Sequence, residues 1–214
     1  MIGIVVGAAP LGEEAADIKD LIKAGNVYTV AADGGILFFI QQGIVPNAWL
    51  GDMDSFKQQG IMLPKSFKDV ETSTVDPIKD VTDMELGLVK AIENGCDEIY
   101  IYGGMGGRRQ SHTIANVQML HKFAAKGRKI GLMGDGSEML CVQNGTLELP
   151  ARDSGFVSVF SLTDKSKGVK INGLFYDFGG ELTNDFALGV SNEFCGKAAT
   201  ISVEEGTLLV VYEG

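Results

Sequence analysis

Short apolar runs and helical stretches alternate along the first part of the chain. The runs predict strands, and each ends near a Gly or an Asp: Ile2–Val6, Val27–Ala32, Ala48–Leu50, Glu98–Tyr102 and Lys129–Met133. Strands that alternate with helices in this way are typical of a parallel sheet that helices cover on both faces.

Two of the intervening segments have a clear helical period. Apolar residues share one face of Asp83–Glu93, and Thr82 with Glu85 three residues later predicts a capping box at its start. A second helix is expected over about Thr113–Lys126, with Gly127 as its stop. Both helices fit the alternating pattern of the first part of the chain.

After residue 135 the helical period disappears. Asn144-Gly145 predicts the turn of a β-hairpin between the strands on either side of it. Strands are predicted at Glu138–Val142, Thr146–Leu149, Phe156–Leu162, Val169–Ile171, Leu174–Phe178, Ala198–Val203 and Thr207–Tyr212. We therefore expect an α/β domain with a mainly parallel sheet over residues 1–135, followed by an all-β antiparallel sandwich over residues 136–214.

Charge and cysteine content narrow the function classes. The 214 residues contain 18 Lys and Arg against 28 Asp and Glu, a net charge of −10 with no basic tract, so nucleic acid is not expected as a partner.

The three cysteines lie far apart in the sequence and predict buried free thiols. No basic residue precedes the first apolar stretch, which indicates a strand and not a signal peptide. We expect a cytoplasmic protein with no membrane segment.

A pair of carboxylates directly follows the third predicted strand. Asp52 and Asp54 stand one residue apart in Gly51-Asp52-Met53-Asp54-Ser55. In an open α/β sheet, ligands bind outside the carboxyl ends of the strands, and Mg²⁺ favours one or two carboxylates beside phosphate oxygens. An Asp-rich turn that caps the next segment is the alternative interpretation.

A second polar cluster opens the helix that begins at Asp83. Carboxylates at a helix start are often ordinary capping groups, and this interpretation stays open for Asp80 and Asp83. Lys79 and the Thr82 hydroxyl could instead donate hydrogen bonds to a nucleotide, and Asp83 could complete a Mg²⁺ shell.

A glycine-rich segment follows the fourth predicted strand. Glycines at 103, 104, 106 and 107 let backbone N–H groups approach phosphate, and Arg108 and Arg109 could pair with phosphate oxygens. No Gly-x4-Gly-Lys-Ser/Thr motif is present, which excludes a P-loop kinase. Asp33-Gly34-Gly35 also lies at a strand end, so a parallel sheet would gather all of these clusters along one edge.

The chain resembles thiamine pyrophosphokinases in the order and spacing of these motifs. The resemblance runs from Val6-Gly7 to the final strand and rests on Ala32–Gly35, Gly51–Ser55, Asp80–Glu85, Gly104–Asn116 and Gly189–Glu193. It implies an α/β domain followed by a β-sandwich, and a homodimer with sites between subunits.

The resemblance also implies roles for individual residues. Asp52, Asp54 and Asp83 would hold Mg²⁺ and, with Arg109, form the catalytic set. The residues implied for ATP are Asp33, Ser55, Lys79, Asp80, Thr82, Gly106, Gly107, Arg108, Arg109 and His112. Those implied for thiamine are Ser191, Asn192 and Glu193. One position departs from the family pattern Arg-x-Asp-His, because this chain has Ser111 in place of the Asp.

The implied reaction is attack of the thiamine hydroxyl on the β-phosphorus of ATP, with release of AMP. Such a transfer depends mostly on alignment and charge neutralisation. Two alternatives stay open: a pterin-alcohol pyrophosphokinase of the same fold, and a thiamine- or nucleotide-binding module without turnover. AMP release with thiamine or with a pterin alcohol separates the three.

Overall fold

The chain folds into two compact units in the computed structural model, which describes residues 1–51, 60, 62–74, 81–106, 109–134 and 136–214. Unit 1 comprises Met1–Asn116 with Leu132–Asp135, and unit 2 comprises Val117–Gly131 with Gly136–Gly214. Helix α5 (Gln110–Ala124) and strand β6 (Lys129–Gly134) contribute residues to both units. Among the described residues, none of the helices is long and apolar enough to cross a membrane.

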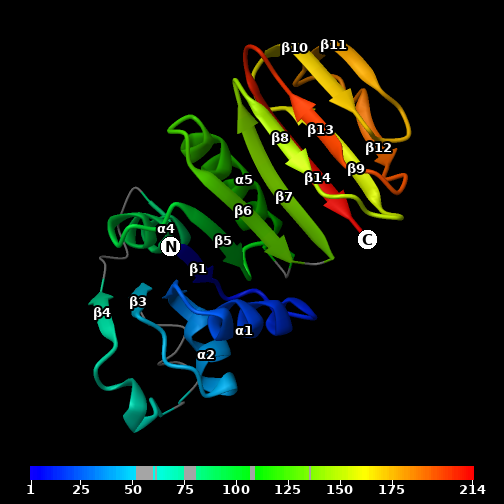
Figure 1. The fold of residues 1–214 in the computed structure, drawn as a ribbon. Coiled ribbons are helices and arrows are strands. Elements are labelled where there is room, and N and C mark those ends of the chain that lie inside the picture. The colour runs from blue at the N-terminus through cyan, green and yellow to red at the C-terminus, as the bar shows by residue number, and fades with distance from the viewer. Residues whose placement is uncertain (52–59, 61, 75–80, 107–108, 135) are drawn as a thin grey trace. The chain divides into compact units, whose positions relative to one another are not determined.

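Unit 1 is built on a sheet in which the neighbouring strands β5, β1, β2, β3 and β4 all run parallel (Figure 1). Its strand order is β6-β5-β1-β2-β3-β4. The strands are β1 (Ile2–Val6), β2 (Val27–Ala32), β3 (Ala48–Gly51), β4 (Glu71–Thr74) and β5 (Glu98–Tyr102). The helices are α1 (Glu14–Ala24), α2 (Ile36–Gln42) and α4 (Asp83–Glu93), with short 3-10 turns η1 (Asp33–Gly35) and η2 (Lys65–Phe67).

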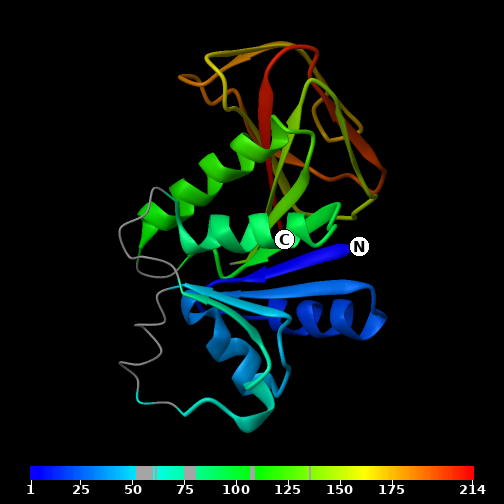
Figure 2. The ribbon, with the colours of Figure 1, turned by 90° about the vertical axis from the view of Figure 1, so that its left-hand side faces the viewer.

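Helices cover both faces of this sheet. Helices α1 and α2 lie on one side of β1 to β3, and α4 lies on the other (Figure 2). Ile4 and Val6 belong to the same apolar cluster as residues of α1 and α2, whereas Val5 faces Gly87 of α4. Successive residues of a strand point to opposite faces, so β1 must be apolar at every position. This explains why the strand is a continuous apolar run, and it confirms the predicted parallel sheet.

The order of the strands creates a switch point beside β1. From β1 the chain adds β2, β3 and β4 on one side, and it then returns to place β5 on the other side. The carboxyl ends of β1 and β5 therefore stand side by side where the strand order reverses, and a crevice can form at the loops that leave them. In open α/β sheets this crevice is where ligands bind.

Unit 2 contains two antiparallel sheets, as the sequence predicted. One has the order β12-β9-β14-β7 and the other β11-β10-β13-β8. The strands are β7 (Ser137–Gln143), β8 (Thr146–Leu149), β9 (Phe156–Ser161), β10 (Lys165–Asn172), β11 (Phe178–Thr183), β12 (Gly189–Glu193), β13 (Ala199–Ser202) and β14 (Thr207–Glu213). One apolar cluster joins residues of both sheets, including Val159 and Val210 from the first and Ile171 and Ile201 from the second.

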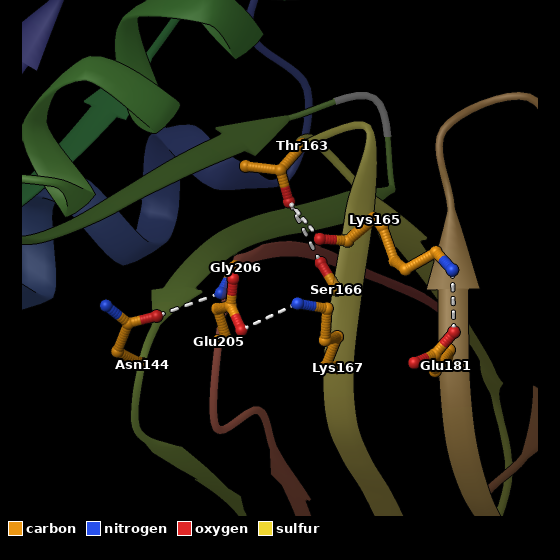
Figure 3. Close-up of polar contacts among 8 residues, drawn as sticks. All are labelled: Asn144, Thr163, Lys165, Ser166, Lys167, Glu181, Glu205 and Gly206. Carbon is orange, nitrogen blue, oxygen red and sulfur yellow. Dashed lines mark hydrogen bonds and ion pairs between the residues drawn. The ribbon is translucent and has the colours of Figure 1, made fainter.

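The predicted hairpin at Asn144-Gly145 is wrong. Asn144 has the positive φ of 44° that such a turn requires, but β7 pairs with β14 and β8 pairs with β13 in the other sheet. Asn144 accepts a 2.9 Å hydrogen bond on its side-chain oxygen from the Gly206 amide, which fixes the turn to the segment before β14 (Figure 3). The chain does turn at Asn144, but the pairing of β7 with β14 and of β8 with β13 places the two strands in different sheets.

The predicted strand Leu174–Phe178 is also wrong. The chain turns there, Asp177 accepts a 3.0 Å hydrogen bond from the Gly173 amide, and β11 begins only at Phe178. The cysteines are free as predicted, but of the three only Cys96 is buried, because Cys141 is half-buried and Cys195 is exposed.

Two edge strands escaped prediction, namely β4 and β12. Both are short and mostly polar, so neither carries the apolar alternation that identifies a strand.

Candidate functional site

A pocket of about 480 Å³ opens at the switch point of unit 1. Segments from four places along the chain line it: the loop after β1, the turn after β2, the start of α4, and the loop that joins β5 to α5. The lining residues are Gly7, Ala8, Ala9, Pro10, Ala32, Asp33, Thr82, Asp83, Met84, Gly103, Gly104, Gly106, Arg109, His112, Ala115 and Asn116. The sheet thus gathers the described parts of three predicted clusters, at Asp33, at Thr82–Asp83 and at the glycine-rich segment, along one edge.

The loops after β1 and β5 lie against each other with only backbone between them. The Gly7 amide donates to the Tyr102 carbonyl at 2.7 Å, and the Ala9 amide donates to the Gly103 carbonyl at 3.1 Å. Gly103 has a φ of 62°, and a Cβ at this position would lie 2.6 Å from the Gly7 carbonyl oxygen. Glycine is therefore required here, and its small size opens the pocket to a ligand.

Asp33 is held in a left-handed conformation at the end of β2, with a φ of 46°. Its carbonyl accepts a 3.0 Å hydrogen bond from the indole Nε1 of Trp49, which stands on the neighbouring strand β3. Gly51, the last residue before Asp52, packs so closely that a Cβ there would lie 3.0 Å from the Asp33 Cα. A positive φ is uncommon for a residue with a side chain, although Asp adopts it more readily than most, and residues in such strained conformations cluster at functional sites.

The N-terminus of α4 forms another wall of the pocket. Thr82 is the N-cap, and its hydroxyl accepts a 3.2 Å hydrogen bond from the Glu85 amide, as the sequence predicted. Asp83 occupies the first turn and lines the pocket. Free N–H groups and the helix dipole favour an anion at this position.

The glycine-rich loop leads into α5, whose first residues complete the pocket. Arg109 and His112 are exposed there, and the His112 amide donates to the Arg109 carbonyl at 2.9 Å. The buried side chain of Asn116 donates to the Gly104 carbonyl and so holds this loop from below. In the sequence Asn116 stands out only as part of the family motif, because a buried amide in a helix gives no periodic signal of its own.

Several predicted site residues lie outside the described part of the chain: Asp52, Asp54, Ser55, Lys79, Asp80, Gly107 and Arg108. Of the remaining predicted nucleotide and metal residues, the pocket brings together Asp33, Thr82, Asp83, Gly106, Arg109 and His112. Ser111 is exposed and does not belong to the described pocket lining.

The donor set suits a hard cation and a phosphate chain. Two carboxylates, Asp33 and Asp83, line one pocket together with the Arg109 guanidinium. The described residues alone contain no group of three or more His, Cys, Asp or Glu side chains arranged to hold a metal ion. The predicted partners of Asp83, namely Asp52 and Asp54, belong to the part of the chain that is not described.

The predicted acceptor residues lie in unit 2 on β12. Ser191 and Glu193 are exposed, whereas Asn192 is buried and bonds to the backbone of Tyr176. The rings of Phe175 and Tyr176 are 62% and 64% exposed and stand edge to face, with centroids 4.7 Å apart. The sequence pattern predicts a strand over both residues, so it does not indicate an exposed aromatic pair.

Two family models match the chain. The model described as "Thiamin pyrophosphokinase, catalytic domain" matches residues 19–132. The model described as "Thiamin pyrophosphokinase, vitamin B1 binding domain" matches residues 146–208. A curated relative, thiamine pyrophosphokinase of Bacillus subtilis, is 26% identical over 199 residues, which cover 91% of this chain and 92% of the relative.

Solved structures agree with these matches. The crystal structure of thiamine pyrophosphokinase from Bacillus subtilis has a TM-score of 0.86 at 24% identity and covers 100% of this chain and 99% of its own. Thiamin pyrophosphokinase from Geobacillus thermodenitrificans gives a TM-score of 0.85 at 26% identity, with 100% and 98% covered. The Candida albicans enzyme shares the fold at 13% identity, with a TM-score of 0.76 over 100% and 89% of the two chains. The family resemblance seen in the motifs is confirmed, and the chain belongs to the thiamin pyrophosphokinase family.

Proposed function

We propose that this enzyme transfers a pyrophosphoryl group from ATP to the hydroxyl of thiamine, giving thiamine diphosphate and AMP. The observation that carries the proposal is the pocket at the switch point of unit 1, where glycine backbone, two helix starts, Arg109 and two carboxylates converge. In a chain of this family, that combination suits a nucleotide with a bound cation. We assign ATP binding to residues 1–135 and thiamine binding to residues 136–214.

The pocket would hold the triphosphate through its backbone and its cationic groups. The loop at 103–106 and the start of α4 offer N–H donors, and Arg109 offers a planar fork for two phosphate oxygens. Thr82, at the start of α4, and His112, in the first turn of α5, add polar side chains to the pocket lining. We further assign Ser55, Lys79, Asp80, Gly107 and Arg108 to the nucleotide on the family resemblance.

A divalent cation fits the carboxylates of this pocket. Asp83 supplies a hard oxygen ligand inside the lining, and we propose that Asp52 and Asp54 complete the set with it. When bound, Mg²⁺ would offset the negative charge that develops on the phosphate oxygens. The chain's own part is to orient the ATP, so that the β-phosphorus faces the acceptor in line with the departing AMP.

The acceptor residues on β12 suit a flat, cationic molecule. The thiazolium of thiamine carries a positive charge, and Glu193 presents an exposed carboxylate beside Ser191. The exposed Phe175 and Tyr176 rings offer faces that attract a cation and stack on a heterocycle. We propose a homodimer in which the acceptor residues of one chain serve the ATP pocket of its partner, and a cytoplasmic location.

The proposal is tested with purified protein, ATP and Mg²⁺, to which thiamine, a pterin alcohol or no acceptor is added. We expect release of AMP only when thiamine is present. Equal or greater release with the pterin alcohol would move the assignment to that acceptor, because the ATP pocket would serve either reaction. Tight binding of thiamine with no AMP release would instead identify a binding module without turnover.

A further inference from the structure

Ser191 occupies an irregular position on the edge strand β12. The ladder pairs Gly189 with Val159 and Asn192 with Val157, so the two residues between them oppose the single residue Ser158. The register shift is a β-bulge, and Ser191 there has a left-handed φ of 60°. A bulge re-aims a side chain out of the regular alternation, and a positive φ costs free energy for any residue with a Cβ. Interactions with neighbouring residues must therefore stabilise Ser191 in this conformation.

Ser158 holds one side of the bulge. Its side chain is nearly buried, and its Oγ accepts a hydrogen bond from the Ser191 amide at 3.1 Å. This bond replaces the ladder bond that the bulge removes, so the Ser191 amide is satisfied although its residue has left the regular pairing. The Ser191 side chain is left exposed.

Asn192 holds the other side and ties it to the aromatic turn. Its Oδ1 accepts from the Tyr176 amide at 3.0 Å and from its own neighbour, the Glu193 amide, at 2.9 Å. Its Nδ2 donates to the Tyr176 carbonyl at 2.7 Å. A buried amide that bonds both backbone groups of one residue fixes that residue firmly, and its oxygen has no further capacity for a ligand. Asn192 therefore has a structural role, since its side chain bonds to the backbone around the proposed acceptor surface.

We infer that Ser158 and Asn192 are positioning residues for the acceptor: Ser158 fixes the strained Ser191 backbone, and Asn192 fixes the Phe175–Tyr176 turn beside it. This inference rests on the proposed function, because it takes Ser191 and the aromatic pair as the surface that receives thiamine. It gives Asn192 an indirect role, through Tyr176, in place of direct contact with thiamine.

The test compares three variants, Ser158→Ala, Asn192→Ala and a matched control, Ser161→Ala. Ser161 stands on the same strand as Ser158 and is also buried, but its hydroxyl bonds to the Thr163 carbonyl at 2.6 Å, away from β12. Steady-state kinetics give KM for thiamine and for ATP, and hydrogen exchange reports the Ser191 and Tyr176 amides. Ser158→Ala keeps the test decisive if Asn192→Ala fails to fold.

Loss of the single positioning hydrogen bond in Ser158→Ala should raise KM for thiamine by about two- to tenfold, and loss of three hydrogen bonds in Asn192→Ala should raise it by at least as much. KM for ATP should stay unchanged. The Ser191 amide should exchange faster in Ser158→Ala and the Tyr176 amide faster in Asn192→Ala. Ser161→Ala should lower Tm without altering KM for thiamine or either amide.

Two different results would contradict the positioning inference and the proposed function separately. If KM for thiamine in Ser158→Ala and Asn192→Ala matches that in Ser161→Ala while the wild-type chain turns over thiamine, the positioning roles are overturned. A wild-type chain that releases no AMP with thiamine would contradict the proposed function, and the exchange of the two amides would then still confirm or refute the bonds that hold them.

Discussion

Individual hydroxyl groups in unit 2 differ in whether they have a hydrogen-bond partner. Thr163 and Ser166 contact each other at 3.2 Å through their hydroxyl oxygens, as Figure 3 shows. Thr207 is fully buried nearby, and within the described part of the chain its hydroxyl oxygen has no hydrogen-bond partner. A buried polar group without a partner retains most of its desolvation penalty.

Thr207→Val should therefore stabilise the protein. Valine keeps the shape of threonine and removes the unsatisfied hydroxyl, so the free energy of unfolding should rise by about 1 kcal/mol. Urea denaturation measures the change. Thr163→Val is the matched control, because it removes a hydroxyl that is bonded and should lower stability. A Thr207→Val protein that is less stable than the wild type would mean that the hydroxyl is satisfied by water.

Arg109→Ala should weaken the use of ATP. A planar guanidinium that binds two phosphate oxygens has no equivalent in water, so KM for ATP should rise or kcat should fall by about tenfold or more. Arg128→Ala, at an exposed position after α5, is the control and should leave the kinetics of ATP unchanged. Normal ATP kinetics in Arg109→Ala would show that the glycine-rich loop has only a structural role.

The candidate site residues that the sequence predicts are those whose chemistry is local, and the roles that we infer to depend on the fold were not predicted. Asp33, Asp83 and Arg109 follow predicted strands or open helices, and a parallel sheet was expected to bring such positions to one edge. Ser158 and Tyr176 carry no such signal. Their importance depends on a bulge and a turn, and long-range pairing creates both.

The packing of α4 on the sheet depends on one close approach. Gly87 lies in the middle of the helix, and a Cβ there would stand 2.8 Å from Val5 Cγ1 and 3.5 Å from Val30 Cγ1. Helix propensity alone favours alanine at such a position by about 1 kcal/mol. Overpacking of a filled core costs about 1–3 kcal/mol, and Val5 is fully buried with little room to move. The steric cost should win.

Gly87→Ala is thus expected to lower the free energy of unfolding by about 1 kcal/mol, despite the better helix former. It should also raise KM for ATP, because α4 carries Thr82 and Asp83 into the pocket at its N-terminus. Denaturation and ATP kinetics measured on the same protein check both effects. A more stable Gly87→Ala protein would show that the helix can move away from β1 without penalty.

At the level of elements, prediction succeeded where the apolar pattern was strong. Strands β1, β2, β5 and β8 have the predicted bounds, and α4 does too. Failures came at polar edges and at turns. Strand β12 has one large apolar residue, and the strand predicted at Leu174–Phe178 is a turn whose aromatic residues are exposed. Aromatic residues favour strands in general, but Phe175 and Tyr176 are exposed in a turn, so their strand propensity predicted the wrong element.

At the scale of the whole molecule, the two proposed binding surfaces lie in different units. The pocket that we propose for ATP belongs to unit 1, and the residues that we propose for the acceptor belong to unit 2. The acceptor hydroxyl must come within about 3–3.5 Å of the β-phosphorus for reaction. A two-fold dimer would meet this need twice, through reciprocal contacts.

Mixed dimers test this arrangement. Asp83→Asn removes a proposed cation ligand, and Ser191→Ala removes a proposed acceptor contact, so each homodimer should lose most activity. A co-assembled heterodimer should form one intact composite site and recover part of the activity. Purified heterodimers that stay as inactive as their parents would show that each site lies within one chain.

The central claim is pyrophosphoryl transfer to thiamine, and phosphorus NMR of a single reaction mixture tests it most directly. With ATP, Mg²⁺ and thiamine, the account predicts that the ATP signals give way to equal amounts of AMP and thiamine diphosphate. Formation of ADP and thiamine monophosphate would contradict it, because the attack would then fall on the γ-phosphorus. So would loss of ATP with release of free pyrophosphate and no phosphorylated thiamine.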